Sequence, residues 1–306
     1  PPADRPTLRF VAARDFAHVL ILEARVAALE GDADRAQRAL HSMVRLASHV
    51  GQTPSLQSAM VAESIRKLAR TTFLTLGASL ELDPTCLESG IGPSRREEMK
   101  RAFLVDHAKC IKMLCGAAMD ETSVMIGRLQ ELIPIGPAPL TRWAYRMIAL
   151  PTDVADTERC CDEYHNAIDR PGASLRPLPL PPRGMLSHVV MPRLDGGLLS
   201  VDHAEALDRI PPIAAAVRRF ERAHGRWPTS IDELVPTYLD AVPDDPLSPR
   251  PTPMRIAVVN GNLAIYRSTS DSGDDGDIAR DTGTPLSPDL GYVIKPAVRP
   301  TGPPGE

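Results

Sequence analysis

Apolar residues in the first half of the chain recur every three or four positions, a spacing that gathers them on one side of a helix. Such stripes occupy residues 16–27, 36–50 and 61–76. Before the third stripe, Thr53 is a suitable helix cap and Pro54 suits a first helical position, where its missing N–H costs nothing. The short loop between the first two stripes predicts an antiparallel helical hairpin.

A second group of helices follows a break around residues 83–93. Ser94 and Glu97 have the spacing of a capping box, which predicts a helix from there to about Gly116. Further helical patterns cover residues 120–133, 140–150 and 152–169. Together these segments predict a helical bundle or short solenoid.

The next part of the chain begins with residues 170–183, which are rich in proline, show no periodicity and therefore predict a linker. Residues 185–224 are again helical in pattern, with interruptions expected at Gly196-Gly197 and Pro211-Pro212, and Gly225 stands where a left-handed helix cap is expected. Ser230 to Glu233 is a second capping box, which predicts a short helix.

The apolar period then changes from 3.6 to two, the period of a strand. Residues 255–259 and 263–267 flank Asn260-Gly261, and this dipeptide favours the tight turn of a β-hairpin. Residues 290–294 predict a third strand. The fold class is therefore α+β, and the predicted domains are a helical domain (1–169), a proline-rich linker (170–183), a helix plus small antiparallel sheet (184–296) and a disordered tail (297–306).

Charge and hydropathy narrow the possible functions. Lys and Arg number 35 against 39 Asp and Glu, a formal net charge of -4, which argues against a dedicated nucleic-acid binder. No apolar run reaches the ~18 residues that a membrane span needs. Because the sequence starts at Pro1, an anchor or signal segment preceding it stays open. The five cysteines are too few and too irregular for a disulfide framework.

An acidic loop is the most distinctive candidate site. Within residues 268–278, carboxylates and glycines alternate closely, and Ca²⁺ prefers such hard oxygen ligands. The loop has neither the length nor the terminal Glu of an EF-hand, and a solvated acidic turn would use the same residue types. The candidate calcium ligands are Asp271, Asp274, Asp275 and Asp277.

Histidine and cysteine offer weaker candidates. Cys110 and Cys115 lie about 140° apart around a helix axis and cannot meet on one ion. His107 and Cys110 share an apolar stripe, which favours packing in a core. The adjacent pair Cys160-Cys161 is also interpreted as packing. No phosphate-binding loop or nucleophile elbow is present in the sequence.

One segment resembles a known family. In residues 217–246 a helix ends at His-Gly, a Trp-Pro turn and a Leu-Val-Pro helix follow, and Pro-Asp-Asp-Pro closes the segment. This order is similar to the soluble domain of the major pseudopilins of type II secretion, in which a hairpin and a calcium-binding acidic loop come next. The loop departs from the family by having Ser268-Thr269-Ser270 in place of Ser-x-Gly. The matching positions are Gly225, Trp227, Pro228, Leu234, Pro236 and Pro243-Asp244-Asp245-Pro246.

The whole chain is similar to uncharacterised bacterial envelope proteins in which a helical region precedes such a domain. The resemblance implies a structural calcium ion held by the four aspartates of the acidic loop, and a place in the cell envelope or periplasm, anchored or exported. The first interpretation is thus a non-enzymatic structural or interaction protein with a protein partner. One alternative is a helical-repeat scaffold that binds a partner. The other is an enzyme with a site between the domains, built on His107, His165 or the acidic loop.

Overall fold

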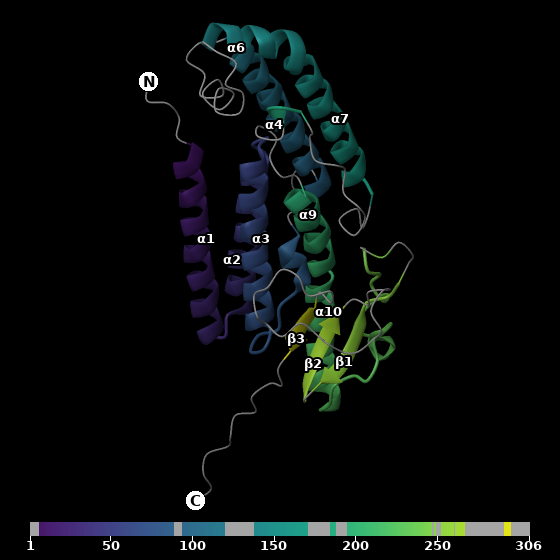
Figure 1. Cartoon of the computed structure of the whole chain (residues 1–306). Coiled ribbons are helices and arrows are strands. Elements are labelled where there is room, and N and C mark those ends of the chain that lie inside the picture. The colour runs from purple at the N-terminus through teal and green to yellow at the C-terminus, as the bar shows by residue number, and fades with distance from the viewer. Residues whose placement is uncertain are drawn as a thin grey trace, which may run out of the picture. The chain divides into compact units, whose positions relative to one another are not determined.

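The fold is mostly helical with one small antiparallel sheet, which confirms the α+β class at this level (Figure 1). The computed structural model describes residues 6–88, 94–119, 138–170, 184–187, 195–246, 248, 252–259, 261–266 and 291–294. The helical elements are α1 (Pro6–Leu29), α2 (Ala33–Gly51), α3 (Leu56–Leu76), η1 (Pro84–Leu87), α4 (Arg95–Met119), α6 (Ala138–Ala144), η2 (Tyr145–Ala149), α7 (Leu150–Ile168), α9 (Asp195–Leu207), α10 (Ile210–His224) and η4 (Ile231–Leu234). The strands are β1 (Arg255–Val259), β2 (Asn262–Tyr266) and β3 (Gly291–Ile294).

The chain divides into two compact units made of interleaved segments. Unit 1 comprises Pro1–Val50, Val61–Gly92 and Asp202–Glu306, and unit 2 comprises Gly51–Met60 and Pro93–Val201. The division therefore falls inside α3 and α9. The sequence pattern predicts a helical domain at 1–169, a linker at 170–183, a helix-plus-sheet domain at 184–296 and a tail at 297–306, and these boundaries stay predictions. Residues 171–183 of the linker and the whole tail lie outside the described residues.

In unit 1, α1, α2 and α3 lie side by side and share one apolar core (Figure 1). Small residues line much of this core, and fully buried alanines let the helix backbones approach closely. Larger side chains, among them Leu40, Met43 and Ile65, fill the remaining space. Between α1 and α2 the predicted break at Gly31 is present with φ 75°, and Asp32 caps α2 by accepting a hydrogen bond from the Arg35 amide at 2.9 Å.

The second core of unit 1 lies between α10 and the sheet. The strands are ordered β1-β2-β3, all antiparallel, with Ile256 opposite Ile265 and Leu263 opposite Ile294. One face of this sheet packs on the apolar side of α10, which presents Ile213, Val217 and Phe220 among others. The predicted hairpin is confirmed: Gly261, in the turn, has φ 77°, which a residue with a side chain rarely adopts.

Unit 2 is built around the helix pair α4 and α7 (Figure 1). Phe103 and Tyr164 meet at a ring-centroid distance of 6.2 Å, within a core that also contains Met99, Cys110 and Ile168. Near the C-terminal end of α7, Arg96 donates a hydrogen bond to the Ile168 carbonyl. The apolar stripe predicted for α4 is thus the side that this helix buries.

One predicted helix start and one predicted helix end are confirmed. Ser94 and Glu97 form the reciprocal capping box, with backbone-to-side-chain distances of 3.2 and 3.3 Å. Gly225 ends α10 with φ 70° and donates its amide to the Glu221 carbonyl at 2.8 Å. The cap of α3 is shifted, because Ser55 rather than Thr53 accepts the hydrogen bond from the Ser58 amide, at 3.1 Å.

Two expected interruptions are wrong. The break between α9 and α10 falls at Asp208–Arg209, because Pro211 and Pro212 stand in the first turn of α10, where proline is tolerated. Gly197 lies inside α9 and provides room for Phe103: a Cβ at this position would come 3.3 Å from the Phe103 ring. Among the described helices, none has the length and hydrophobicity to cross a membrane.

Candidate functional site

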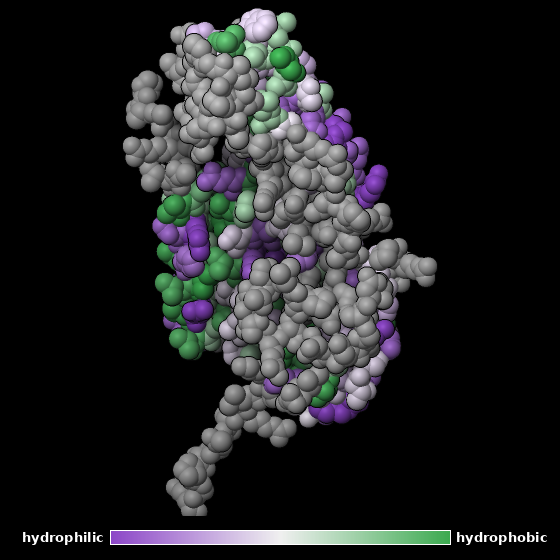
Figure 2. Space-filling model, in the orientation of Figure 1, coloured by the Kyte–Doolittle hydropathy of each residue, from purple (hydrophilic) through white to green (hydrophobic). Residues whose placement is uncertain are grey.

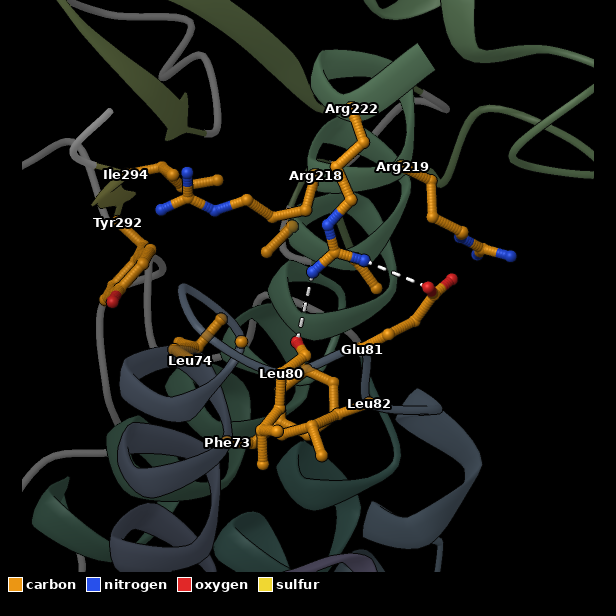
Figure 3. Close-up of a pocket in the computed structure, with 13 residues that line it drawn as sticks. Phe73, Leu74, Leu80, Glu81, Leu82, Arg218, Arg219, Arg222, Tyr292 and Ile294 are labelled. Carbon is orange, nitrogen blue, oxygen red and sulfur yellow. Dashed lines mark hydrogen bonds and ion pairs between the residues drawn. The ribbon is translucent and has the colours of Figure 1, made fainter. Parts of the chain in front are cut away.

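An open pocket in unit 1 is the best-formed candidate site in the described part of the chain (Figure 3). Its empty space is about 420 Å³, counted out to the open mouth. It lies where the end of α3, the segment after it, α10 and β3 come together. The lining residues are Phe73, Leu74, Gly77, Leu80, Glu81, Leu82, Ala214, Ala215, Arg218, Arg219, Arg222, Tyr292 and Ile294.

Most of the pocket wall is apolar. One side of the pocket is formed by Phe73, Leu80 and Leu82, whose exposed fractions are 8 % or less. Opposite them, Ala214 and Ala215 on α10 have short side chains, which leaves the space that a larger residue would fill. A wall of this kind favours an apolar group of a ligand over water.

Arg222 forms the polar edge of the pocket. Its guanidinium donates to the Leu80 carbonyl at 3.3 Å and pairs with Glu81 at 3.1 Å, as the dashed lines in Figure 3 show. Both partners of the ion pair are accessible to water, with side-chain exposures of 42 % for Arg222 and 68 % for Glu81. Such an exposed pair contributes about 0–1 kcal/mol, so an incoming carboxylate can replace Glu81 on Arg222 at little cost.

Arg218 adds a second, more enclosed positive charge. Figure 3 shows its guanidinium extending toward Ile294. The residue is 9 % exposed, pairs with Glu221 at 2.9 Å and lies 5.4 Å from the ring centroid of Trp227. This distance places the guanidinium within reach of a cation–π interaction with Trp227. Trp227, interpreted from the sequence as a packed corner, does pack against the core between α10 and the sheet.

The chemistry of the pocket is that of a recognition site for an apolar group beside an anion. Arg219 also lies at the edge and donates to the Tyr238 carbonyl at 3.4 Å. Glu81 is the one acidic residue among those that line the pocket, against three arginines. A guanidinium offers a carboxylate a planar pair of donors, which a lysine cannot.

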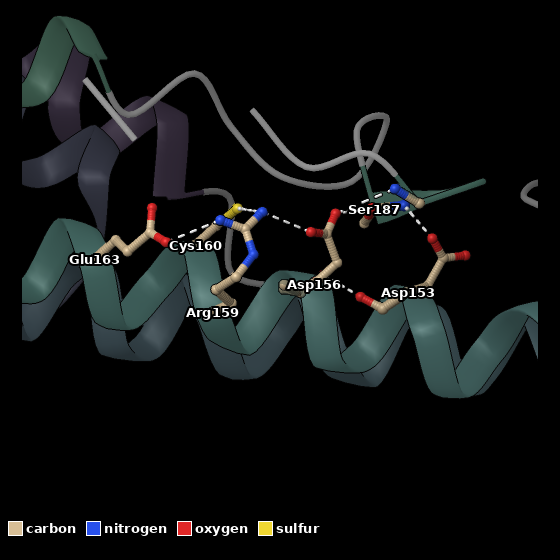
Figure 4. Close-up of polar contacts among 8 residues, drawn as sticks. Asp153, Asp156, Arg159, Cys160, Glu163 and Ser187 are labelled. Carbon is tan, nitrogen blue, oxygen red and sulfur yellow. Dashed lines mark hydrogen bonds and ion pairs between the residues drawn. The ribbon is translucent and has the colours of Figure 1, made fainter. Parts of the chain in front are cut away.

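A polar network in unit 2 connects α7 to residues 184–187 (Figure 4). Asp153 is fully buried and accepts hydrogen bonds from the Tyr145 hydroxyl at 2.9 Å and from the amides of Leu186 and Ser187 at 3.0 and 3.1 Å. Burial next to this carboxylate raises the pKa of Tyr145. The oxygens of Asp153 are thus used by the protein's own backbone, and the network fastens residues 184–187 to α7.

Along α7 the same network continues to the surface. Asp156 accepts from the Gly184 amide at 3.1 Å and pairs with Arg159 at 2.7 Å, and Arg159 reaches Glu163 at 2.9 Å. These pairs raise the pKa of the Arg159 guanidinium, chiefly through the hydrogen bond to Asp156. They are spaced three and four residues apart, as expected of ion pairs on a helix surface.

The predicted calcium ligands lie outside the described residues. Asp271, Asp274, Asp275 and Asp277 belong to residues 267–290, which the structure does not describe, and the ion site stays a prediction. Within the described ranges, no group of three or more His, Cys, Asp and Glu side chains is placed to hold a metal ion.

The candidate residues His107, Cys110 and Cys115 lie on α4, and His165 and the Cys160-Cys161 pair lie on α7. Cys110 and Cys160 are buried in the core between these helices, as the packing interpretation expects, while Cys115 is exposed. Burial raises the pKa of Cys161 to about 12, so its thiol is protonated at neutral pH. His107 Nε2 and His165 Nδ1 are buried and have no hydrogen-bond partner among the described residues, and neither residue lines the pocket of unit 1.

The comparisons with known proteins add no relative. No protein-family model matches the sequence, no match was found among the curated proteins, and no solved structure matches the fold.

The pocket arginines are absent from the candidates that the sequence suggests. Their spacing on the amphipathic helix, at positions 218, 219 and 222, is a visible signal. The opposite wall, however, comes from residues 73–82 and 292–294, which are far away in the chain. Only the folded chain brings these segments to α10.

Proposed function

We propose that this protein is a non-enzymatic interaction protein of the cell envelope, exported or membrane-anchored, and that the pocket of unit 1 binds a partner protein. The observation that carries the proposal is the apolar wall beside the weakly paired Arg222. The matching ligand is the C-terminal residue of a partner chain, with an aliphatic side chain in the pocket and its carboxylate on Arg222.

Three features support this ligand class. The wall of Phe73, Leu80 and Leu82 takes an aliphatic side chain and removes it from water. Arg222 already pairs with a carboxylate, that of Glu81, at 3.1 Å. Arg218 and Arg219 also line the pocket, so that its polar edge has three guanidiniums and the one carboxylate of Glu81.

N-acetyl-leucine is the smallest probe of the proposed site, and N-acetyl-leucinamide is its neutral counterpart. In amide-resolved NMR of the full chain, the acid is expected to shift signals from residues 74–82 and 214–222. The neutral probe is expected to bind up to about fivefold more weakly, since an exposed ion pair such as the one that Arg222 makes contributes about 0–1 kcal/mol.

Substitutions distinguish the contribution of Arg222 to binding from that of the apolar wall. Arg222→Gln is expected to abolish the preference for the acid over the neutral probe. The matched control Arg45→Gln, at an exposed position on α2, is expected to keep that preference. Equal affinity for both probes, or no saturable shift with the acid at millimolar concentrations, would refute the proposal.

We also propose that the segment from α10 onward is a pseudopilin-like domain stabilised by calcium at Asp271, Asp274, Asp275 and Asp277. The order of elements supports this: α10 ends at a left-handed Gly225, η4 follows, and a hairpin and a third strand come after. In the Pro-Asp-Asp-Pro turn, Asp245 is buried and its amide donates to the Thr252 carbonyl at 2.8 Å. The envelope location rests on the same resemblance.

Thermal melting of the full chain in EDTA and in 1 mM Ca²⁺ tests this second proposal. For a dissociation constant of ~10 μM, mass action stabilises the protein by about 2.7 kcal/mol. In a unit of this size, that raises the melting temperature by about 5–10 °C. Asp274→Ala combined with Asp275→Ala is expected to remove the shift, whereas Asp240→Ala, an exposed carboxylate elsewhere, keeps it. The same melting temperature with and without calcium would refute the ion site.

A further inference from the structure

Helix α1 has a second apolar face, opposite the one that it buries. On the inner face, Ala17, Ala24 and Ala27 are fully buried. On the outer face large apolar side chains are exposed, and in Figure 2 hydrophobic surface gathers where Figure 1 places α1. The exposed fractions are 56 % for Val19, 60 % for Leu22, 43 % for Val26 and 89 % for Leu29. Contiguous exposed side chains of this kind mark interaction surfaces.

The spacing of the outer face is that of a coiled coil. Val19, Leu22, Val26 and Leu29 are separated by three, four and three residues, so they occupy the a and d positions of two successive heptads. Both a positions are valine and both d positions are leucine. β-branched residues at a combined with leucine at d favour two parallel strands, because this is the geometry in which both side-chain shapes pack well.

The charges beside this face also favour a parallel pair of identical helices. In that arrangement a g position faces the e position five residues later in the second helix. Arg25 stands at g and Glu30 at the following e, so each Arg25 would meet the Glu30 of the second copy. An antiparallel pair would instead bring Glu23 near Glu23 and Arg25 near Arg25. Like charges are thus juxtaposed only in the antiparallel case.

The charged residues beside the outer face of α1 do not block the pairing of two copies. Arg25 is exposed, and among the described residues no ion pair involves it. Glu23 and Glu30 lean toward α2, where Arg35 binds Glu23 at 2.6 Å and Glu30 at 2.5 Å. Glu30 has a second carboxylate oxygen for another cation.

We propose that two copies of this chain associate through α1, with the two helices parallel and in contact along residues 18–30. Asp15, which stands at the preceding d position, ends the apolar seam on the N-terminal side. A seam of two heptads is short, so the association is concentration-dependent. The occupant of the outer face is a second copy because the face is complementary to itself in both side-chain shape and charge.

Sedimentation equilibrium of the full chain across micromolar to several hundred micromolar concentrations tests the proposal. The expected result is a reversible monomer–dimer equilibrium. Leu22→Glu is expected to weaken the association at least about 100-fold, since each of the two chains loses one buried leucine and gains a charge. The matched control Leu104→Glu, at a leucine of α4 that is 55 % exposed, leaves the equilibrium unchanged.

Two further variants report on the arrangement of the pair. Asp15→Leu extends the seam by one position and is expected to tighten the association, a gain that loss of folding cannot imitate. Arg25→Glu is expected to weaken it, because that change puts like charges opposite each other in the parallel pair.

Several results would overturn the proposal. They are a monomer at every concentration, a dimer that Leu22→Glu leaves intact, or a dimer that Arg25→Glu does not weaken. Flotation with neutral lipid vesicles provides another: if the chain floats and Leu22→Glu prevents this while the protein stays monomeric, the face binds lipid and not a second copy.

Discussion

Asp153 shows how a single buried carboxylate can hold a segment of chain in place. It is 0 % exposed and receives hydrogen bonds from Tyr145, Leu186 and Ser187. Gly184 stands so close that a Cβ there would lie 1.9 Å from Asp153 Oδ1. A glycine is therefore required at this position by the approach of the carboxylate.

Replacing Asp153 tests this role. Asp153→Asn exchanges one acceptor oxygen for a donor that faces the Leu186 and Ser187 amides, and is expected to lower the free energy of unfolding by about 1–3 kcal/mol. Tyr145→Phe removes only one donor and should cost less, about 0.5–1.5 kcal/mol. Urea denaturation followed by circular dichroism measures both. An Asp153→Asn variant as stable as the unaltered protein would show that the network contributes nothing.

The sequence did not single out Asp153, and the reason is physical. Its tyrosine partner is eight residues away, but the amides that it binds are about thirty residues away, beyond the predicted linker. Local rules of spacing cannot show such partners. By contrast, the placement of Cys110 in a core was predictable, because it follows from the apolar stripe of its own helix.

At the scale of elements, helix ends were predicted where their signals are local. The capping box of α4 and the glycine that ends α10 depend on residues within one turn. The second predicted capping box, Ser230 to Glu233, has different hydrogen bonds from those expected of an α-helix. Ser230 accepts from the Asp232 amide at 3.0 Å, and Glu233 turns to Arg226 at 2.7 Å. A 3-10 turn brings a nearer amide to the cap than an α-helix does.

The contacts of Glu233 predict a pH dependence. Hydrogen bonds from Arg226 first, and then from Thr229, lower the pKa of Glu233 from 4.5 to about 2. A carboxyl with a lowered pKa stabilises the fold above its unfolded value of 4.5 and loses this effect as the pH falls toward 2. Glu233→Gln is therefore expected to melt at a lower temperature at pH 7, with the difference shrinking between about pH 4.5 and 2.

Thermal melts of both proteins across this range provide the measurement. The change is small, because the carboxylate is at the surface. Asp240→Asn removes one negative charge at another exposed carboxylate and controls for net charge. A difference between Glu233→Gln and the unaltered protein that stays constant down to pH 2 would show that ionisation of Glu233 is not its cause.

For the whole molecule, the sequence predicted the class of the fold but did not foresee which segments share a compact unit. The helices, the hairpin and the third strand follow from local periodicity and turn chemistry. The contacts between residues 73–82 and α10 do not, because they depend on surfaces that complement each other in three dimensions. The pocket is made of such contacts, and it was missed for that reason.

The interleaving of the units also matters during synthesis. Residues 1–50 and 61–92 reach the ribosome exit well before residues 202–294, with which they complete unit 1. Phe73, Leu80 and Leu82 must stay in the nascent chain without their partners on α10 while the whole of residues 93–201 is translated. The α4–α7 pair can close during that interval, because both helices lie within residues 93–201. The rate of translation across residues 93–201 thus sets how long this apolar surface stays exposed before α10 is synthesised and can pack on it.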